Sequence, residues 1–222
     1  YTNPKGIHHI QLLKNNIERH REEAMPILDD MLMDEFGNLG IKYEQITWDE
    51  KKNKEGKAIK RSLNINDIKA LEPFHWGYEF SEIFRKKDGF DAIITNPPWE
   101  TFQPNSKEFL MKFSNSISKK KMDIKDFIEE FQKLMENEDV RHEWIKYSSD
   151  YNHVREYFRF APQYINQVPI IDGKRHGKDI NLYKLFTEQC YGLLKKGGYC
   201  GIVIPSGIYS DLGSKKLREL LF

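Results

Sequence analysis

The chain has 222 residues, which is long enough to bury a substantial core in one or two domains. With 31% charged residues it has no apolar stretch near the ~20 residues that a membrane span requires. Its 35 lysines and arginines nearly balance its 34 aspartates and glutamates, so the net charge of +1 does not indicate nucleic-acid binding.

Residues 1–72 are predicted to form a helical and loop segment that packs on a sheet. Ile10, Leu13 and Ile17 follow helical spacing, and Pro26 predicts a break in the helix. Residues 37–61 are polar and contain several lysines and glycines, which is typical of a loop or an irregular hairpin.

The apolar run from Phe90 to Thr95 follows the turn-like Lys87-Asp88-Gly89 and predicts a strand buried on both faces. Asn96, Pro97, Pro98 and Trp99 come directly after it, at the end of the strand where open α/β sheets bind ligands. Because the prolines restrict the backbone, this loop is expected to be stiff.

A stiff loop of this composition suits chemistry on an amino group. The lone pair of a purine exocyclic amino group is delocalised into the ring, so the nitrogen is a poor nucleophile. The Asn96 side-chain oxygen and the Pro97 carbonyl oxygen could accept its two hydrogens and localise the lone pair. Trp99 offers a face on which a base can stack. An isolated Asn-Pro-Pro is more often a plain strand terminator, but the strand before it and Trp99 after it favour function.

A helical insertion is predicted at about residues 104–169. Its expected helices cover residues 106–118, 123–136 and 138–158. Phe127 and Phe131 begin an apolar stripe that continues with Leu134 and Met135. The many aromatic residues of the insertion, Tyr147 and Tyr151 among them, could meet DNA or flank a flipped base, but a packed helical subdomain is favoured.

The C-terminal part predicts strand, crossover, strand and helix. A helix capped by Asp179 or Asn181 is expected to end at Lys195–Gly198 with a left-handed glycine. A strand over 199–204 follows, and a last helix starts near Gly213. This order predicts an α/β fold with a partial doubly wound, Rossmann-like sheet and helical insertions, in which residues 73–222 form the catalytic half.

Asn96-Pro97-Pro98-Trp99 resembles the catalytic motif of the S-adenosylmethionine-dependent amino-methyltransferases, above all the DNA adenine-N6 enzymes. The resemblance implies that Asn96 and Pro97 bind the target amino group, that Trp99 stacks on the flipped base, and that Pro98 belongs to the base-binding loop. Asn181-Leu182-Tyr183 and the run from Gly197 to Pro205 resemble the next two motifs of that family.

The resemblance implies that Asn181, Leu182 and Tyr183, together with Asn96, line the cofactor pocket. For Tyr183 a place in the core is an equal alternative. The Phe74–Phe84 segment looks like the lead-in of large type IIG restriction–modification enzymes. That likeness implies double-stranded DNA as partner, a target-recognition region and a fused endonuclease, in a prokaryotic cytoplasm. The two cysteines, Cys190 on a helix and Cys200 on a buried strand, are then expected to stay reduced.

The basic, glycine-flanked loop 173–178 predicts DNA phosphate contacts by Lys174, Arg175 and Lys178. No metal is required. The sequence has no Gly-x-Gly turn for the cofactor, starts at Tyr1 without methionine and ends within an expected helix. We therefore expect an excerpt of a larger protein, with the cofactor half, target recognition and any nuclease in its remaining domains.

Two alternatives remain open. The same loop serves enzymes that methylate protein glutamine or the guanine amino group of ribosomal RNA, although the long insertion and the lead-in favour DNA. The chain could also be a non-catalytic DNA-binding module that keeps the fold without the cofactor half.

Overall fold

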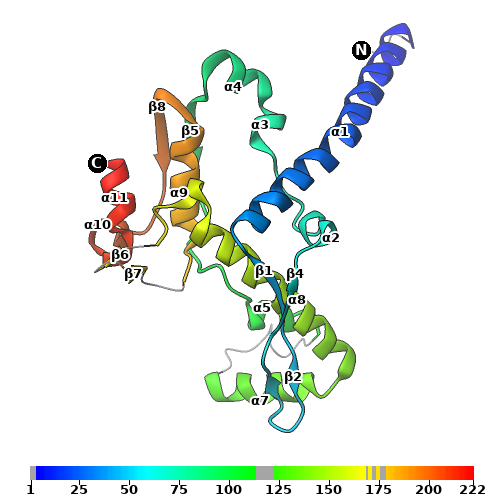
Figure 1. The fold of residues 1–222 in the computed structure, drawn as a ribbon, viewed down its shortest axis with the longest axis vertical. Helices are drawn as coiled ribbons and strands as arrows, with labels where there is room; N and C mark the ends of the chain where they lie inside the picture. Colours follow the sequence, from blue (N-terminus) through cyan, green and yellow to red (C-terminus); the bar gives the residue numbers. More distant parts are fainter. Residues whose placement is uncertain (1–3, 114–122, 169, 172–173, 176–178) are drawn as a thin grey trace. The chain divides into compact units, whose positions relative to one another are not determined.

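The computed structural model describes residues 4–113, 123–168, 170–171, 174–175 and 179–222 (Figure 1). It divides into two compact units. The first unit joins Tyr1–Gly40 to Leu63–Ser81, and the second joins Ile41–Ser62 to Glu82–Phe222. None of the described helices is both long enough and apolar enough to cross a membrane.

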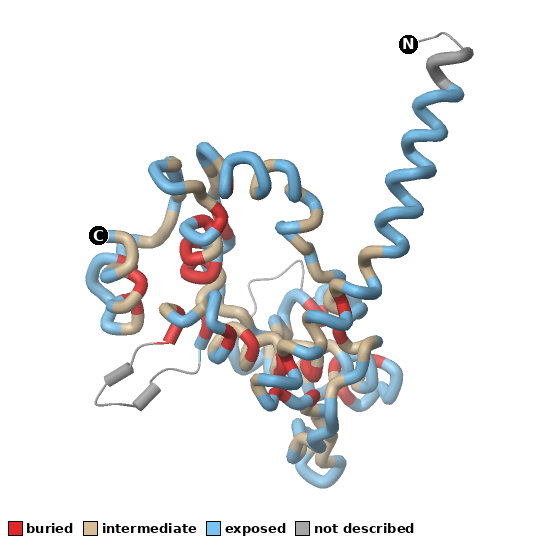
Figure 2. The backbone as a smooth tube through the Cα atoms, turned by 45° about the horizontal axis from the view of Figure 1, so that its top comes forward, coloured by how far each residue is buried: buried red, intermediate tan, exposed pale blue. Residues whose placement is uncertain are grey.

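The first unit is dominated by one long helix, α1 (Pro4–Asn38). The predicted break at Pro26 is wrong, because α1 continues through this residue. Proline removes one backbone donor, but the Glu, Ala, Met and Leu residues on both sides favour a helix and hold the flanking turns. Figure 2 shows α1 as exposed over residues 8–23, and the apolar Ile10, Leu13 and Ile17 are 43%, 48% and 66% exposed there.

Two short helices complete this unit, α2 (Ile65–Lys69) and α3 (Trp76–Glu79). A capping box fixes the start of α2, because the Asn64 side chain accepts from the Asp67 backbone and the Asp67 side chain accepts from Asn64. Two polar pairs involve α1: His75 Nε2 lies 3.4 Å from Asp29 Oδ1, and Arg21 lies 3.1 Å from Glu79. The contact with Asp29 ties His75 to α1 within this unit.

The second unit begins with a hairpin where a loop or irregular hairpin is predicted. Its outer strands are β1 (Lys42–Gln45) and β4 (Ile59–Ser62), which pair antiparallel, and its tip is formed by β2 (Trp48–Asp49) and β3 (Lys54–Glu55).

The insertion is a packed helical subdomain, as predicted. Its helices are α5 (Ser106–Leu110), α7 (Ile124–Met135) and α8 (Glu138–Phe160). The first helix ends earlier than expected, and residues 114–118 of that prediction lie outside the described residues. The core of the subdomain consists of Phe109, Leu110, Met135, Val140 and Trp144, with Phe127, Phe131 and Leu134 packed against it.

Hydrogen bonds attach the hairpin to α8. Tyr43 donates to Asp150 at 3.0 Å, and the Ile46 backbone donates to Ser149 Oγ at 2.9 Å. Burial and the neighbouring Asp150 carboxylate raise the pKa of Tyr43 to about 12, so its phenol stays a hydrogen-bond donor at neutral pH.

The sheet that carries the candidate site has two strands. After α4 (Ser81–Lys87), β5 (Phe90–Thr95) pairs in parallel with β8 (Leu194–Ile202), which directly follows α9 (Leu182–Leu193). Gly89 has a φ of +137°, and a Cβ there would lie 2.5 Å from the Lys195 backbone nitrogen. Only glycine therefore allows the two chains to approach so closely at the start of β5.

Several short elements complete the unit. They are β6 (Ile170–Ile171), β7 (Lys174–Arg175), α10 (Gly207–Ser210) and α11 (Lys215–Leu221). The last helix starts where the sequence predicts it, and its Leu217 is fully buried against Tyr183 and Ile208.

The predicted burial of β5 on both faces is wrong. Ile94 is 89% exposed, and Tyr199 of β8, which pairs with Ala92, is 79% exposed. Among the described residues β5 pairs with β8 alone, and nothing covers the face that bears these two side chains. Cys200 is also exposed, contrary to expectation. Gly197 has the expected positive φ of 79°, but it lies within β8 and does not end α9.

Candidate active site

The loop Asn96–Trp99 leaves the carboxyl end of β5, as predicted. Pro97 is buried and anchors the loop, whereas Asn96 is exposed. Trp99 is 52% exposed, so much of its ring is open to a ligand. Asn96 and Trp99, which would contact a base, are therefore exposed on either side of the buried Pro97.

Trp99 is fixed at the edge of its ring. Its indole Nε1 donates a hydrogen bond to the carbonyl oxygen of Val203, at 3.2 Å. The Val203 backbone nitrogen in turn donates to the carbonyl oxygen of Thr95, at 3.2 Å. This hydrogen bond orients the indole through its edge and does not itself occupy a ring face, which is where a base would stack.

The segment after Trp99 pairs with the start of α9. The Phe102 nitrogen donates to the Ile180 carbonyl at 2.7 Å, and the Leu182 nitrogen donates to the Glu100 carbonyl at 2.9 Å. Between them, Thr101 Oγ1 donates to Asn181 Oδ1 at 3.2 Å. This pairing brings two of the sequence motifs together, although about 80 residues separate them in the chain.

The predicted cofactor residues have different surroundings. Asn181 is the N-cap residue of α9, but its side chain accepts from Thr101 and makes no capping bond. Leu182 is half-buried. Tyr183 is only 5% exposed and packs against Ile208 and Leu217, and burial raises the pKa of its phenol. Its ring is thus part of the core, which was the alternative interpretation.

A small polar cavity of about 310 Å³ begins immediately after Trp99. Glu100 and Glu108 line it together with Tyr147 and Tyr151, whose hydroxyl oxygens lie 3.0 Å apart. Burial, with the hydrogen bond to Tyr147, raises the pKa of Tyr151. Carboxylates and hydroxyls are suitable acceptors for amino and amide N–H groups, so this cavity beside the loop suits a heterocyclic ring that carries such groups.

The opposite end of β5 carries a compact charge cluster. The Asp91 carboxylate pairs with Lys87 at 2.8 Å and also with Lys195. Lys195 and Lys87 together lower the pKa of Asp91 to about 2. This cluster joins α4 to both strands and lies at the start of β5, away from the Asn96 loop.

The predicted DNA contacts are only partly described. Lys174 and Arg175 form β7, which pairs antiparallel with β6. Lys178 lies outside the described residues.

Sequence reasoning missed Thr101 and the carbonyl of Val203. Val203 could have been found, because two parallel strands that both end at prolines place their carboxyl ends at the same edge of a sheet. For Thr101 the sequence gives no signal.

The comparison with protein families settles what kind of chain this is. The family described as Eco57I restriction-modification methylase matches residues 11–158 and 162–222. The chain belongs to the Eco57I restriction-modification methylase family. Its members are methylases of restriction–modification systems, and both the Asn96 loop and the start of α9 fall within the matched residues.

A protein of Methanocaldococcus jannaschii is also similar to this chain. Its assigned name is that of a type II restriction enzyme and methyltransferase, and it is 38% identical over 63 residues. The similar region covers 28% of this chain and 5% of that relative, so the match spans a small part of a much longer protein. No solved structure matches the chain.

Proposed function

We propose that the chain is the catalytic part of a type IIG restriction–modification enzyme that methylates the N6 amino group of adenine in double-stranded DNA. The observation that carries the proposal is the fixed and exposed Trp99, held by Val203 beside Asn96 at the end of β5. Membership of the restriction-modification methylase family supports methyl transfer as the reaction.

In the proposed mechanism the target adenine is rotated out of the duplex. It stacks on the open face of Trp99, and its amino group donates to Asn96 Oδ1 and to the Pro97 carbonyl. Buried Pro97 keeps the two acceptors in place, so little reorganisation is needed as charge develops on nitrogen. Positioning supplies most of the rate gain. No metal, no covalent enzyme intermediate and no strong general base are needed, because the nitrogen loses its proton readily once methylated.

S-adenosylmethionine would supply the electrophilic methyl group. Asn96, Asn181 and Leu182 are the predicted residues at or near the surface that would line its pocket, and the buried Tyr183 would support that wall from behind. Asn96 is exposed, and the segment that follows its loop pairs with the start of α9, which fits this role. We also propose that a glycine-rich cofactor turn, target recognition and an endonuclease belong to other parts of the polypeptide, since this sequence has no Gly-x-Gly.

The test is labelled-methyl transfer from S-adenosylmethionine to duplex DNA, ribosomal RNA and protein in parallel, with the polypeptide that contains this chain. Incorporation into DNA alone supports the proposal. Labelling of protein glutamine or of RNA guanine instead would favour one of the alternative amino-methyltransferases. DNA binding without transfer to any substrate would favour the non-catalytic module.

A further inference from the structure

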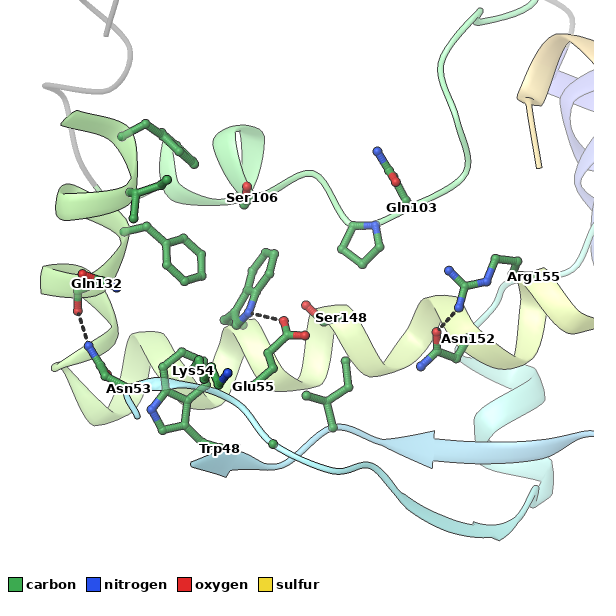
Figure 3. A pocket seen from close by; sticks show the side chains of 17 residues that line it. Trp48, Asn53, Lys54, Glu55, Gln103, Ser106, Gln132, Ser148, Asn152 and Arg155 are labelled. Atoms are coloured by element: carbon green, nitrogen blue, oxygen red, sulfur yellow. Dashed lines mark hydrogen bonds between the residues drawn. The ribbon is translucent and has the colours of Figure 1, made fainter. Parts of the chain in front are cut away.

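A second cavity lies in the helical subdomain, lined by the hairpin tip, α7, α8 and the segment 103–106 (Figure 3). Its volume is about 740 Å³, within the ~300–1,000 Å³ of pockets that hold small organic ligands. All of its lining residues belong to the second unit, and none of them belongs to the Asn96–Trp99 loop. The proposed methyl transfer does not use it.

One part of the wall is aromatic. Trp48 comes from β2, Phe127 and Phe131 come from α7, and Trp144 comes from α8. The rings of Phe131 and Trp144 meet edge to face at 5.4 Å, so both are held by packing. A rigid aromatic wall favours a planar ring as ligand, because stacking needs no further ordering of the protein.

Polar atoms without protein partners lie in the same wall. Ser148 is 2% exposed, and its hydroxyl makes no hydrogen bond to a described residue. The adjacent Ser149 is equally buried, but its hydroxyl donates to the Ile145 carbonyl and accepts from Ile46. The Nε1 of Trp48 is a second buried donor without a partner. Such atoms are rare in native proteins, and here they suit the donors and acceptors on the edge of a heterocycle.

Charged groups line the cavity as well. Arg155 follows Ser148 on α8 and donates to Asn152 Oδ1 at 2.6 Å, while Lys54 and Glu55 come from β3. Glu55 Oε1 accepts from the Trp144 indole at 2.9 Å, which holds the carboxylate against the aromatic wall. Arginine and lysine are suited to phosphate, and a carboxylate is suited to an exocyclic amino group.

We propose that this cavity is a nucleotide-binding site, in which a base lies against Trp48 and Trp144, bonds to Ser148, and places its phosphate near Arg155 or Lys54. The bound unit is either a free nucleotide or a nucleotide of DNA displaced from its stack, since both present the same chemistry. Gln103, Pro104 and Ser106 also line the smaller cavity that follows Trp99, but no residue of the Asn96–Trp99 loop lines this one. The proposal does not depend on the proposed methyl transfer.

The experiment follows binding of AMP, of single-stranded DNA and of a duplex containing 2-aminopurine to the full protein, by calorimetry for AMP and by fluorescence for the DNA. Ser148→Ala should weaken AMP binding about 3- to 10-fold, Trp48→Ala about 10- to 100-fold, and Ser148→Leu, which fills the cavity, should abolish AMP binding. Arg155→Gln should weaken binding about tenfold, whereas Lys146→Gln, an exposed residue of α8 outside the cavity, should not.

Two controls separate binding in this cavity from binding at the Asn96–Trp99 loop and from a general loss of stability. Trp99→Ala should leave AMP binding unchanged, which separates this cavity from the catalytic loop. Thermal unfolding of Ser148→Ala should match or exceed that of the wild type, because the variant removes an unpaired buried hydroxyl. Binding of AMP identifies a free nucleotide as the source, whereas DNA binding that Ser148→Leu weakens, with no binding of AMP, identifies a displaced base. AMP binding that survives Ser148→Leu, or no AMP binding together with DNA binding that Ser148→Leu leaves unchanged, would overturn the proposal.

Discussion

The indole nitrogen of Trp99 donates a hydrogen bond to the carbonyl oxygen of Val203, at 3.2 Å. This contact joins the loop after β5 to the end of β8, which pairs in parallel with β5. It orients the ring while leaving Trp99 52% exposed. A ring that is fixed but open is what stacking of an extruded base requires, since its orientation is set before the base arrives.

Substitutions of Trp99 should separate stacking from orientation. Trp99→Phe keeps an aromatic face but loses the hydrogen bond to Val203, and we expect binding of target DNA to weaken about 3- to 10-fold. Trp99→Ala removes the face too, and we expect a loss of about 10- to 100-fold. The measurement is the dissociation constant for a duplex with 2-aminopurine at the target position.

The exposed Trp76 of α3 offers a matched control, because Trp76→Phe changes an indole outside the loop. Equal binding by Trp99→Ala and the wild type would show that no base stacks on this ring.

Tyr183 is expected to act through packing. Since its ring is buried against Ile208 and Leu217, Tyr183→Phe should leave the KM for S-adenosylmethionine within about threefold and change the unfolding free energy by about 1 kcal/mol or less. Tyr183→Ala should cost about 3–5 kcal/mol, because it leaves a cavity in this core. Steady-state kinetics and denaturant unfolding check both values. A tenfold rise in KM for Tyr183→Phe would instead place its hydroxyl at the cofactor.

The charge cluster at the start of β5 predicts an acid-dependent loss of stability. The pKa of Asp91 is lowered to about 2 by Lys195 and Lys87, so the ionised carboxylate stabilises the fold above the unfolded value near 3.8. That contribution is lost as the pH falls through about 2. Asp91→Asn should therefore lower Tm at pH 7 and have no effect near pH 2.

Because Asp91 is exposed, this Tm difference should be small and should shrink further in 1 M salt. Thermal unfolding of both proteins across the pH range is the measurement. If the Tm difference between Asp91→Asn and the wild type were the same at pH 2 as at pH 7, the charge of Asp91 would not be what stabilises the fold.

The sequence correctly predicted the helices and strands that depend on short-range residue patterns. The apolar run ending at two prolines located β5 and its loop, and the stripe begun by Phe127 located α7. Exposure was mispredicted at Ile94, because an apolar run does not reveal which neighbours cover a strand. The helix through Pro26 was mispredicted because the preferences of the flanking residues outweigh one missing donor.

The links across the site depend on pairing between distant segments. The two strands that end at prolines indicate that Val203 lies near the Asn96–Trp99 loop, but not that its carbonyl accepts from Trp99. Nothing in the sequence indicates the hydrogen bond from Thr101 to Asn181. The same is true of the nucleotide cavity, since Trp48 and Ser148 meet only when the hairpin packs on α8.

The most direct test of the proposed function is the chemical identity of the methylated product and its dependence on Asn96. Labelled S-adenosylmethionine and duplex DNA are incubated with the polypeptide that contains this chain, and the DNA is digested to nucleosides. We predict label in N6-methyldeoxyadenosine, reduced at least about 100-fold by Asn96→Ala. Asn66→Ala, which changes an exposed residue of α2, should leave the label unchanged. Label in a methylated cytosine, or N6-methyladenine formation that survives Asn96→Ala, would contradict the account.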